Sequence, residues 1–242
     1  MSSYYRCKGY DICETPLNLV DEVAILGHIC NHEVVKIKEI NAMPKVHIFE
    51  MSHKRPAFVP SDLGSFRAKV GSLEKMYELS GVFRGGSRLL EAAEVPRSLV
   101  LDKKSVLIDV FGTDDGLKIV SSQFYDLLQR YDPGVHQFFK VELFFPKNVK
   151  VEGDWYVINV HFRKKTVLKT LSGVSTIEDG KPTQFRSHLG DAVFGGLALD
   201  GAHLWREEDF STDMFLSETL MAAIKEGGLK VFRTRTGEIQ TN

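Results

Sequence analysis

Residue types that bind metals occur near the start of the chain, at Cys7, Cys13, Cys30 and His32. Thiolate and imidazole are the ligands that zinc prefers, but structural zinc sites place their cysteines in close pairs, which this spacing does not match. We therefore expect no metal. The sequence has neither a G-x-x-x-x-G-K-[ST] loop nor a G-x-G-x-x-G turn after a strand, so we also expect no cofactor.

Histidine is the next candidate for chemistry, as a general base, and the chain contains eight. None lies in an H-E-x-x-H pattern, and GVSTI is no G-x-S-x-G nucleophile elbow, because Ile177 replaces its last glycine. One alternative is still a hydrolase-type enzyme in which His136 or His203 acts with a carboxylate such as Asp200. A histidine with a perturbed pKa inside a pocket would support it.

The segment WREEDFSTD, residues 205–213, is the most acidic stretch, with four acids and one arginine between aromatic residues. Such a segment can form an acidic lip that binds a basic protein. The alternative is a solvated loop that its aromatic side chains anchor to the core. The predicted partner-binding residues are Trp205, Arg206, Glu207, Glu208, Asp209 and Asp213.

The overall charge limits the other partners. With 31 basic and 32 acidic residues, the formal net charge is −1, and the one basic run, FRKKTVLK, is short. We therefore expect no nucleic acid partner. Residues 23–30 form an apolar run far shorter than the roughly 18 residues that span a bilayer, so no membrane partner is expected. Three cysteines and no secretory signal predict a cytoplasmic protein.

The chain also contains a segment that occurs twice, at 118–143 and at 214–239. Each copy reads as a strand, a serine, an amphipathic helix, a glycine-containing stop and a returning strand. Ser121 and Ser217 head the helices, where a hydroxyl accepts an amide hydrogen of the first turn, so we assign both serines to helix capping and not to nucleophilic chemistry. The apolar stripes are Phe124, Leu127, Leu128 and Tyr131 in one helix and Leu220, Ala223 and Ile224 in the other.

The remaining pattern predicts an α+β fold, with helices packed on a mixed or antiparallel sheet and two similar strand–helix–strand units. Strands are expected at 34–40 (VVKIKEI), 45–51, 105–112 and 154–162, and two helical pieces at 72–93, separated by Gly85 and Gly86. We divide the chain into a strand-rich N-terminal subdomain at 1–100 and an α+β domain at 101–242.

Three stretches carry a resemblance to a known family: LKIVSSQFYDLLQRYDPGVHQFFKVEL, WYVINV and GAHLWREEDFSTDMFLSETLMAAIKEGGLKVF. Over about residues 80–240 the chain resembles the immunity-protein families that accompany contact-delivered polymorphic toxins in bacteria, as in type VI secretion. Here HFRKK follows the WYVINV strand, and Ser172 lacks the nearby acid that is usual in the family.

The resemblance implies a protein without catalytic activity, which protects a cell by binding one cognate toxin and blocking its active site or its assembly. We expect such binding to rest on a few aromatic or arginine anchors inside a polar rim. The remaining alternative is a general adaptor that retains several partners, whereas an immunity protein should retain a single toxin domain.

Overall fold

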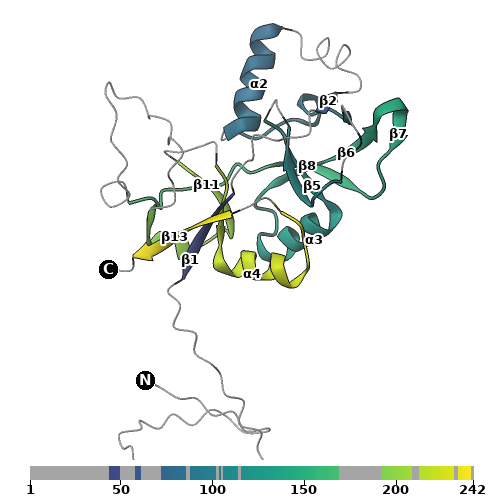
Figure 1. The fold of residues 1–242 in the computed structure, drawn as a ribbon. Helices are drawn as coiled ribbons and strands as arrows, with labels where there is room; N and C mark the ends of the chain where they lie inside the picture. Colours follow the sequence, from purple (N-terminus) through teal and green to yellow (C-terminus); the bar gives the residue numbers. More distant parts are fainter. Residues whose placement is uncertain are drawn as a thin grey trace, which may run out of the picture. The chain divides into compact units, whose positions relative to one another are not determined.

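The computed structural model describes residues 44–49, 58–60, 72–85, 88–101, 104, 106–113, 116–168, 192–208, 213–231 and 234–240, with the backbone alone at 58–60. These residues belong to one compact unit, Ala42–Asn242. The predicted α+β fold is confirmed, because helices and two mixed sheets make up this unit (Figure 1). Several predicted strand segments, including VVKIKEI, lie outside the described residues.

The described helices are the α-helices α2 (Leu73–Gly85), α3 (Ser122–Tyr131) and α4 (Glu218–Glu226) and the short 3-10 helices η1 (Ala92–Glu94), η2 (Pro146–Asn148) and η4 (Gly196–Leu199). The described strands are β1 (Lys45–Phe49), β2 (Phe58–Pro60), β3 (Ser98–Leu101), β4 (Val110–Gly112), β5 (Lys118–Ser121), β6 (Gln137–Phe145), β7 (Val149–Lys150), β8 (Trp155–Asn159), β9 (Arg163–Lys164), β10 (Val193–Gly195), β11 (Leu204–Glu207), β12 (Phe215–Ser217) and β13 (Thr234–Gln240).

The described strands form two sheets. One has the order β10-β13-β1-β12-β11-β9, and the other has the order β2-β3-β6-β8-β5-β4, with β7 paired to β6. Strands from both sides of residue 100 meet in each sheet, because β1 pairs with β12 and β13 while β3 pairs with β6. Among the described strands, pairing therefore marks no boundary near residue 100.

The repeated segments form two equivalent units. In the first, β4 and β5 pair antiparallel, with Val110 opposite Val120. In the second, β11 and β12 pair in the same way, with Leu204 opposite Leu216. A serine-capped helix follows each hairpin, α3 after β5 and α4 after β12. The duplication seen in the sequence is therefore also a duplication of strand pairing.

Each unit adds two more strands in the same order, β8 and β6 in the first and β1 and β13 in the second. The matching cross-strand registers are Ser121–Trp155–Val141 in the first unit and Ser217–Val46–Gly237 in the second. The strand β8 follows its unit along the chain, whereas β1 comes from far ahead of its unit. The second unit is therefore completed by a strand from near the start of the compact unit.

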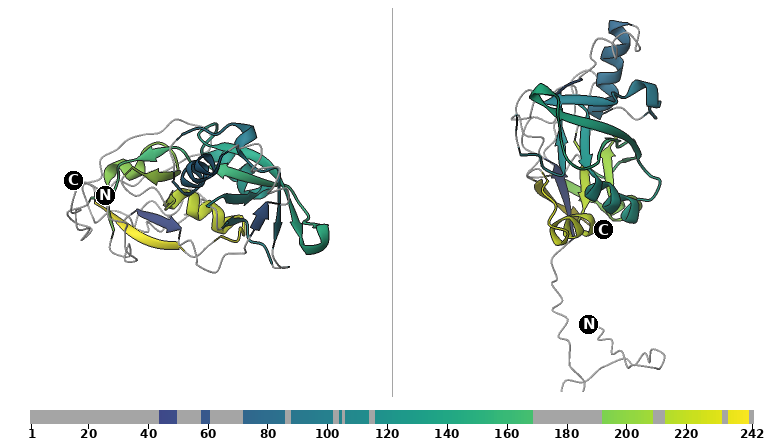
Figure 2. Two further views of the ribbon diagram at one scale, coloured as in Figure 1. Left: turned by 90° about the horizontal axis from the view of Figure 1, so that it is seen from above. Right: turned by 90° about the vertical axis from the view of Figure 1, so that its right-hand side faces the viewer.

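Equivalent residues of the two units share one hydrophobic core beneath α3 and α4, which lie side by side (Figures 1 and 2). The equivalent pairs in this core are Val110 with Leu204, Val120 with Leu216, Phe124 with Leu220 and Leu128 with Ile224. Each helix has an apolar stripe that it cannot cover alone, and joining the units covers both stripes.

The units also exchange backbone contacts at their edges. Asp109, just before β4, exchanges two hydrogen bonds of 2.7 Å with Lys230, which follows α4. His203, just before β11, donates its amide hydrogen to the carboxylate of Asp132, which follows α3, at 2.7 Å. The residue just before the hairpin of each unit therefore binds a residue that follows the helix of the other unit.

The second helical piece predicted within 72–93 is wrong in extent. After α2, residues 88–91 are not helical, and only the 3-10 turn η1 forms. The reason is a competing partner: the Leu90 amide donates to Gln137 Oε1 at 2.8 Å, and the Leu90 carbonyl accepts from Gln137 Nε2 at 3.1 Å. Backbone groups bound to a neighbouring strand are not available to a helix.

Candidate partner-binding site

The predicted partner segment begins with a buried strand. Trp205, Arg206 and Glu207 lie in β11 and are 0%, 1% and 0% exposed. The Trp205 ring stacks on Phe215, with 6.1 Å between centroids, and carries the Lys164 ammonium 4.1 Å from its centre. Burial lowers the pKa of Lys164 to about 8. A partner cannot reach the Trp205 side chain unless the strand is displaced.

Arg206 holds the end of α2. Its guanidinium donates to the carbonyls of Val160 at 2.9 Å, Arg84 at 2.6 Å and Phe83 at 3.4 Å. Arg163 on the neighbouring strand β9 donates to the carbonyl of Gly85, the last residue of α2. Unpaired carbonyls give a helix C-terminus a partial negative charge, so two cations there stabilise the helix.

The buried Glu207 carboxylate is also occupied by local contacts. It accepts the Thr166 amide hydrogen at 2.6 Å, the Thr166 hydroxyl at 2.7 Å and the Val167 amide hydrogen at 3.2 Å. Buried charged groups of this kind need several donors. Glu207 therefore fastens the segment after β9 to β11.

The other three predicted partner-binding residues, Glu208, Asp209 and Asp213, differ in their exposure. Glu208 is exposed, and Asp213 is partly exposed. Burial raises the pKa of the Asp213 carboxyl, although nearby Arg206 and Lys118 oppose the rise. Asp209 lies outside the described residues. Partner contact by this segment stays a prediction, and in the described structure the exposed carboxylate of Glu208 is its accessible part.

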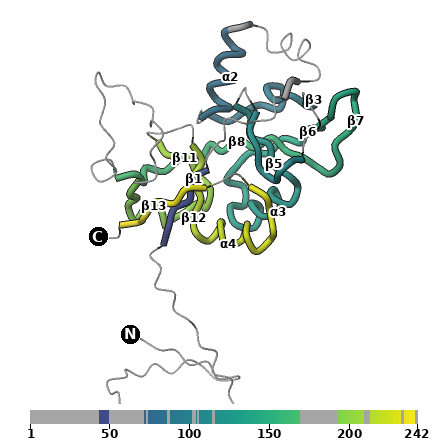
Figure 3. Tube along the Cα trace, viewed as in Figure 1, coloured from purple at the N-terminus to yellow at the C-terminus, as the bar shows by residue number. Residues whose placement is uncertain are grey.

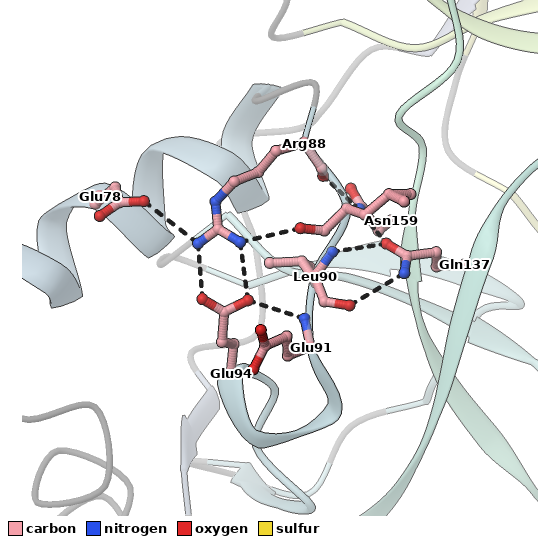
Figure 4. Close-up of polar contacts among 8 residues, drawn as sticks. Glu78, Arg88, Leu90, Glu91, Glu94, Gln137 and Asn159 are labelled. Carbon is pink, nitrogen blue, oxygen red and sulfur yellow. Dashed lines mark hydrogen bonds and ion pairs between the residues drawn. The ribbon is translucent and has the colours of Figure 1, made fainter.

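A polar network joins α2 to the second sheet (Figure 4). Arg88 makes two hydrogen bonds of 2.8 Å to the Glu94 carboxylate and lies 3.4 Å from Glu78 of α2. The Asn159 amide on β8 donates to the Arg88 carbonyl at 3.0 Å and to Gln137 at 2.9 Å. The network therefore fixes the segment between α2 and β3 and leaves few groups for a partner.

The histidines proposed for an enzyme do not meet Asp200 in a described hydrogen bond or ion pair. The buried His136 has Nε2 3.4 Å from Asp132 Oδ2, and its ring lies edge-on to His161 at 6.4 Å. Burial raises the pKa of Asp132, but the nearby His136 and the amides of His203 and Leu204 outweigh it, so this pKa is lowered. Burial also lowers the pKa of His161.

His203 instead contacts the capping serine of α4. Its Nδ1 lies 2.8 Å from Ser217 Oγ, and the same oxygen accepts the Leu220 amide hydrogen at 3.1 Å. The predicted capping role of Ser217 is confirmed, because the serine oxygen holds the first turn of α4. Ser121 caps α3 in the same way. Each serine oxygen therefore accepts an amide hydrogen of the first helical turn and also contacts one side chain, the Asp109 carboxylate for Ser121 and the His203 ring for Ser217.

A groove of about 540 Å³ lies between α3 and α4, where the two repeated units meet. Its apolar part comprises Leu127, Tyr131, Ala223 and Leu229. Its polar lining comprises Gln123, Asp126, Arg130 and Glu226. The groove lining therefore combines apolar with charged side chains, and tyrosine and arginine are among the residues that most often anchor protein interfaces.

The charged rim of the groove is available to a partner. Asp126, Arg130 and Glu226 are exposed, and each forms no hydrogen bond or ion pair with any residue in the described part of the chain. Sequence reasoning missed this site, because its charged residues lie beside the apolar stripes and not in them. The repeat was the only sequence feature that pointed to this groove. Two helices whose apolar stripes pack into one core also bring the residues beside those stripes together.

Comparison with known families identifies the chain's class. Residues 67–237 match the family described as Immunity protein family (Imm11), and the chain belongs to this family. The resemblance noted in the sequence is thereby confirmed. No curated protein matches the chain. Within the described residues, no helix is long and apolar enough to cross a membrane.

Proposed function

We propose that this chain neutralises a cognate antibacterial toxin by direct protein–protein contact, without catalysis and in the cytoplasm. The observation that carries the proposal is the immunity-family match over residues 67–237, which contain the hairpin and helix of both repeated units. The N-cap bonds of Ser121 and Ser217 give both serines a structural role, which agrees with a binding function.

We further propose the groove between α3 and α4 as the main contact surface. A loop or helix of the toxin would place an apolar side chain on Tyr131 and Ala223, which are partly exposed, and a basic side chain between Asp126 and Glu226. Arg130 would pair with an acid on the partner. Charges on the rim speed the encounter and select the partner, whereas the buried apolar contact slows dissociation.

Co-expression with the product of the adjacent upstream gene tests the neutralising function. We expect growth to be rescued and a stable one-to-one complex to be recovered. Loss of growth with that product and with every other neighbouring gene product, despite soluble immunity protein, would overturn the proposal. A pull-down that recovers many unrelated proteins would favour an adaptor instead.

Charge reversal tests the groove separately. The double variant D126K/E226K should weaken the complex at least tenfold, because two attractive contacts become repulsive. The control is E74K, which reverses an exposed acid on α2, outside the groove. A further variant, E208K, tests the accessible part of the predicted segment. If E208K alone weakened binding, the contact surface would lie at the end of β11 and not in the groove.

A further inference from the structure

Strand β7 pairs with β6, whose other edge is paired with β3 from Glu142 to Phe144, and β3 also lies near the turn residues Pro146–Asn148. β8 pairs with the first half of β6, from Gln137 to Val141, whereas β7 pairs with its far end, at Phe144 and Phe145. The turn between β6 and β7 therefore projects beyond β8, as the trace shows (Figures 1 and 3). A projecting turn of this kind can enter a concave surface on another protein.

The turn is formed by a backbone that does not suit its sequence. Lys147 and Asn148 have φ values of 65° and 59°, and in the described chain every other residue with positive φ is glycine. Asparagine tolerates this left-handed region, but lysine disfavours it. Glycine at position 147 would therefore form the same turn with less strain. The fold gives no reason for a lysine here.

The charge of this lysine is also unusual among its neighbours. Lys140 pairs with Asp154 at 2.9 Å, and Lys150 pairs with Glu142 at 2.7 Å. Lys147 is exposed and has no hydrogen bond or ion pair to any residue that the structure describes. Val149, next to the turn, leaves 55% of its surface exposed. The tip therefore combines an unpaired cation with an exposed apolar side chain.

We propose that this tip, formed by Pro146, Lys147 and Val149, inserts into an acidic concave surface of the neutralised protein. The Lys147 ammonium would pair with carboxylates there, while Pro146 and Val149 would exclude water around the pair, which strengthens it. This inference rests on the proposed function, because it names a second contact on the same partner. Strain at a site that folding does not require is typical of functional positions.

The decisive variant is K147G, measured in the full chain against the product of the adjacent upstream gene. We expect K147G to unfold at the same or a higher urea concentration than the wild type, because strain is relieved. We also expect its affinity to fall about tenfold and the salt dependence of association to decrease, because one attractive charge is lost. K147R should keep most of the affinity, and K75Q, at an exposed lysine of α2, should keep all of it.

The outcomes separate the two proposals. If the wild type binds and protects but K147G binds equally well, the tip contact is overturned and the neutralising function stands. If K147G changes only solubility, the lysine protects the hairpin from aggregation and the tip contact is likewise overturned. If the wild type itself neither binds nor protects, the proposed function fails, and the tip contact fails with it.

Discussion

Ser121 and Ser217 occupy the same position in the two repeated units and bind the same backbone atoms. The Ser121 hydroxyl accepts the Phe124 amide hydrogen at 3.3 Å, and the Ser217 hydroxyl accepts that of Leu220 at 3.1 Å. Their own amides donate to the carbonyls of Asp109 and His203, both at 2.9 Å. Each serine therefore fixes the start of a helix to the residue just before the first strand of its hairpin.

Alanine at either serine should lower the free energy of unfolding. An N-cap usually contributes about 1 kcal/mol, and S217A should lose about 2 kcal/mol because it also loses the contact of Ser217 Oγ with His203 Nδ1 at 2.8 Å. S121A should lose about 2 kcal/mol, because Ser121 also donates to the Asp109 carboxylate at 2.6 Å and its removal leaves that acceptor without this donor. Urea unfolding measures both. A variant that unfolds like the wild type but no longer protects cells would instead assign the serine a chemical role.

Replacing Arg206 by lysine should destabilise the compact unit by about 2 to 4 kcal/mol. Burial lowers the pKa of Arg206 to about 10, so the guanidinium stays charged at neutral pH. Its planar fork reaches carbonyls on both α2 and the β8–β9 connection, which a single ammonium cannot do. Urea unfolding of R206K, with R130K in the groove as the exposed control, measures the difference. Equal losses of unfolding free energy in both variants would contradict the role of Arg206 in holding the end of α2.

The local parts of this fold were predictable from sequence, and the reasons are local. A serine at a helix start and an apolar stripe with helical period act within one or two turns, so α3 and α4 were predicted with their caps. Strand partners are not local. No feature of Val46 indicates that it pairs with both Ser217 and Gly237, which lie near the other end of the sequence.

The candidate site shows the same limit. Consecutive charged residues normally indicate a solvated surface, so the sequence predicts that Arg206 and Glu207 are exposed. Their burial depends on partners that only the fold supplies, namely the end carbonyls of α2 and the donors of Thr166. The groove residues carry no local mark either, because an exposed Asp126 on a helix looks like any other solvated acid.

Acidification should destabilise the compact unit in two steps. His161 takes up a proton near pH 6.5 in the unfolded chain, but burial lowers its pKa in the folded state. The unfolded chain therefore binds more protons below about pH 6.5, and stability falls as the pH falls there. The lowered pKa of Asp132 adds a further loss only below about pH 4, where the unfolded carboxylate is protonated.

The variant H161N should reduce the loss of stability between pH 7 and pH 5 and leave the loss below pH 4 unchanged. Urea unfolding between pH 7 and pH 5 measures the first step, and unfolding between pH 4 and pH 3 measures the second. Curves for H161N and the wild type that run parallel between pH 7 and pH 5 would show that His161 does not cause the loss. The contribution would then belong to another group.

Two glycines should respond to alanine in opposite directions. Gly81 lies in the exposed part of α2, and a Cβ there would meet no described atom within 4 Å. Because alanine favours the helix over glycine, G81A should raise the free energy of unfolding by about 1 kcal/mol. Gly237 in β13 has no such room, since its Cβ would overlap the Phe194 ring and lie 2.5 Å from the Ala192 carbonyl oxygen.

G237A should therefore lower the free energy of unfolding by about 1 to 3 kcal/mol, the usual range for overpacking. The first repeated unit tolerates a side chain at the equivalent position, which is Val141 of β6. There the neighbouring strand is β3, whereas the neighbour of β13 is β10. The second unit adds β10 against β13, and Phe194 occupies the space that a side chain at position 237 would need. Urea unfolding of G81A and G237A tests both signs. A G237A variant as stable as the wild type would mean that β10 does not pack against β13 as described.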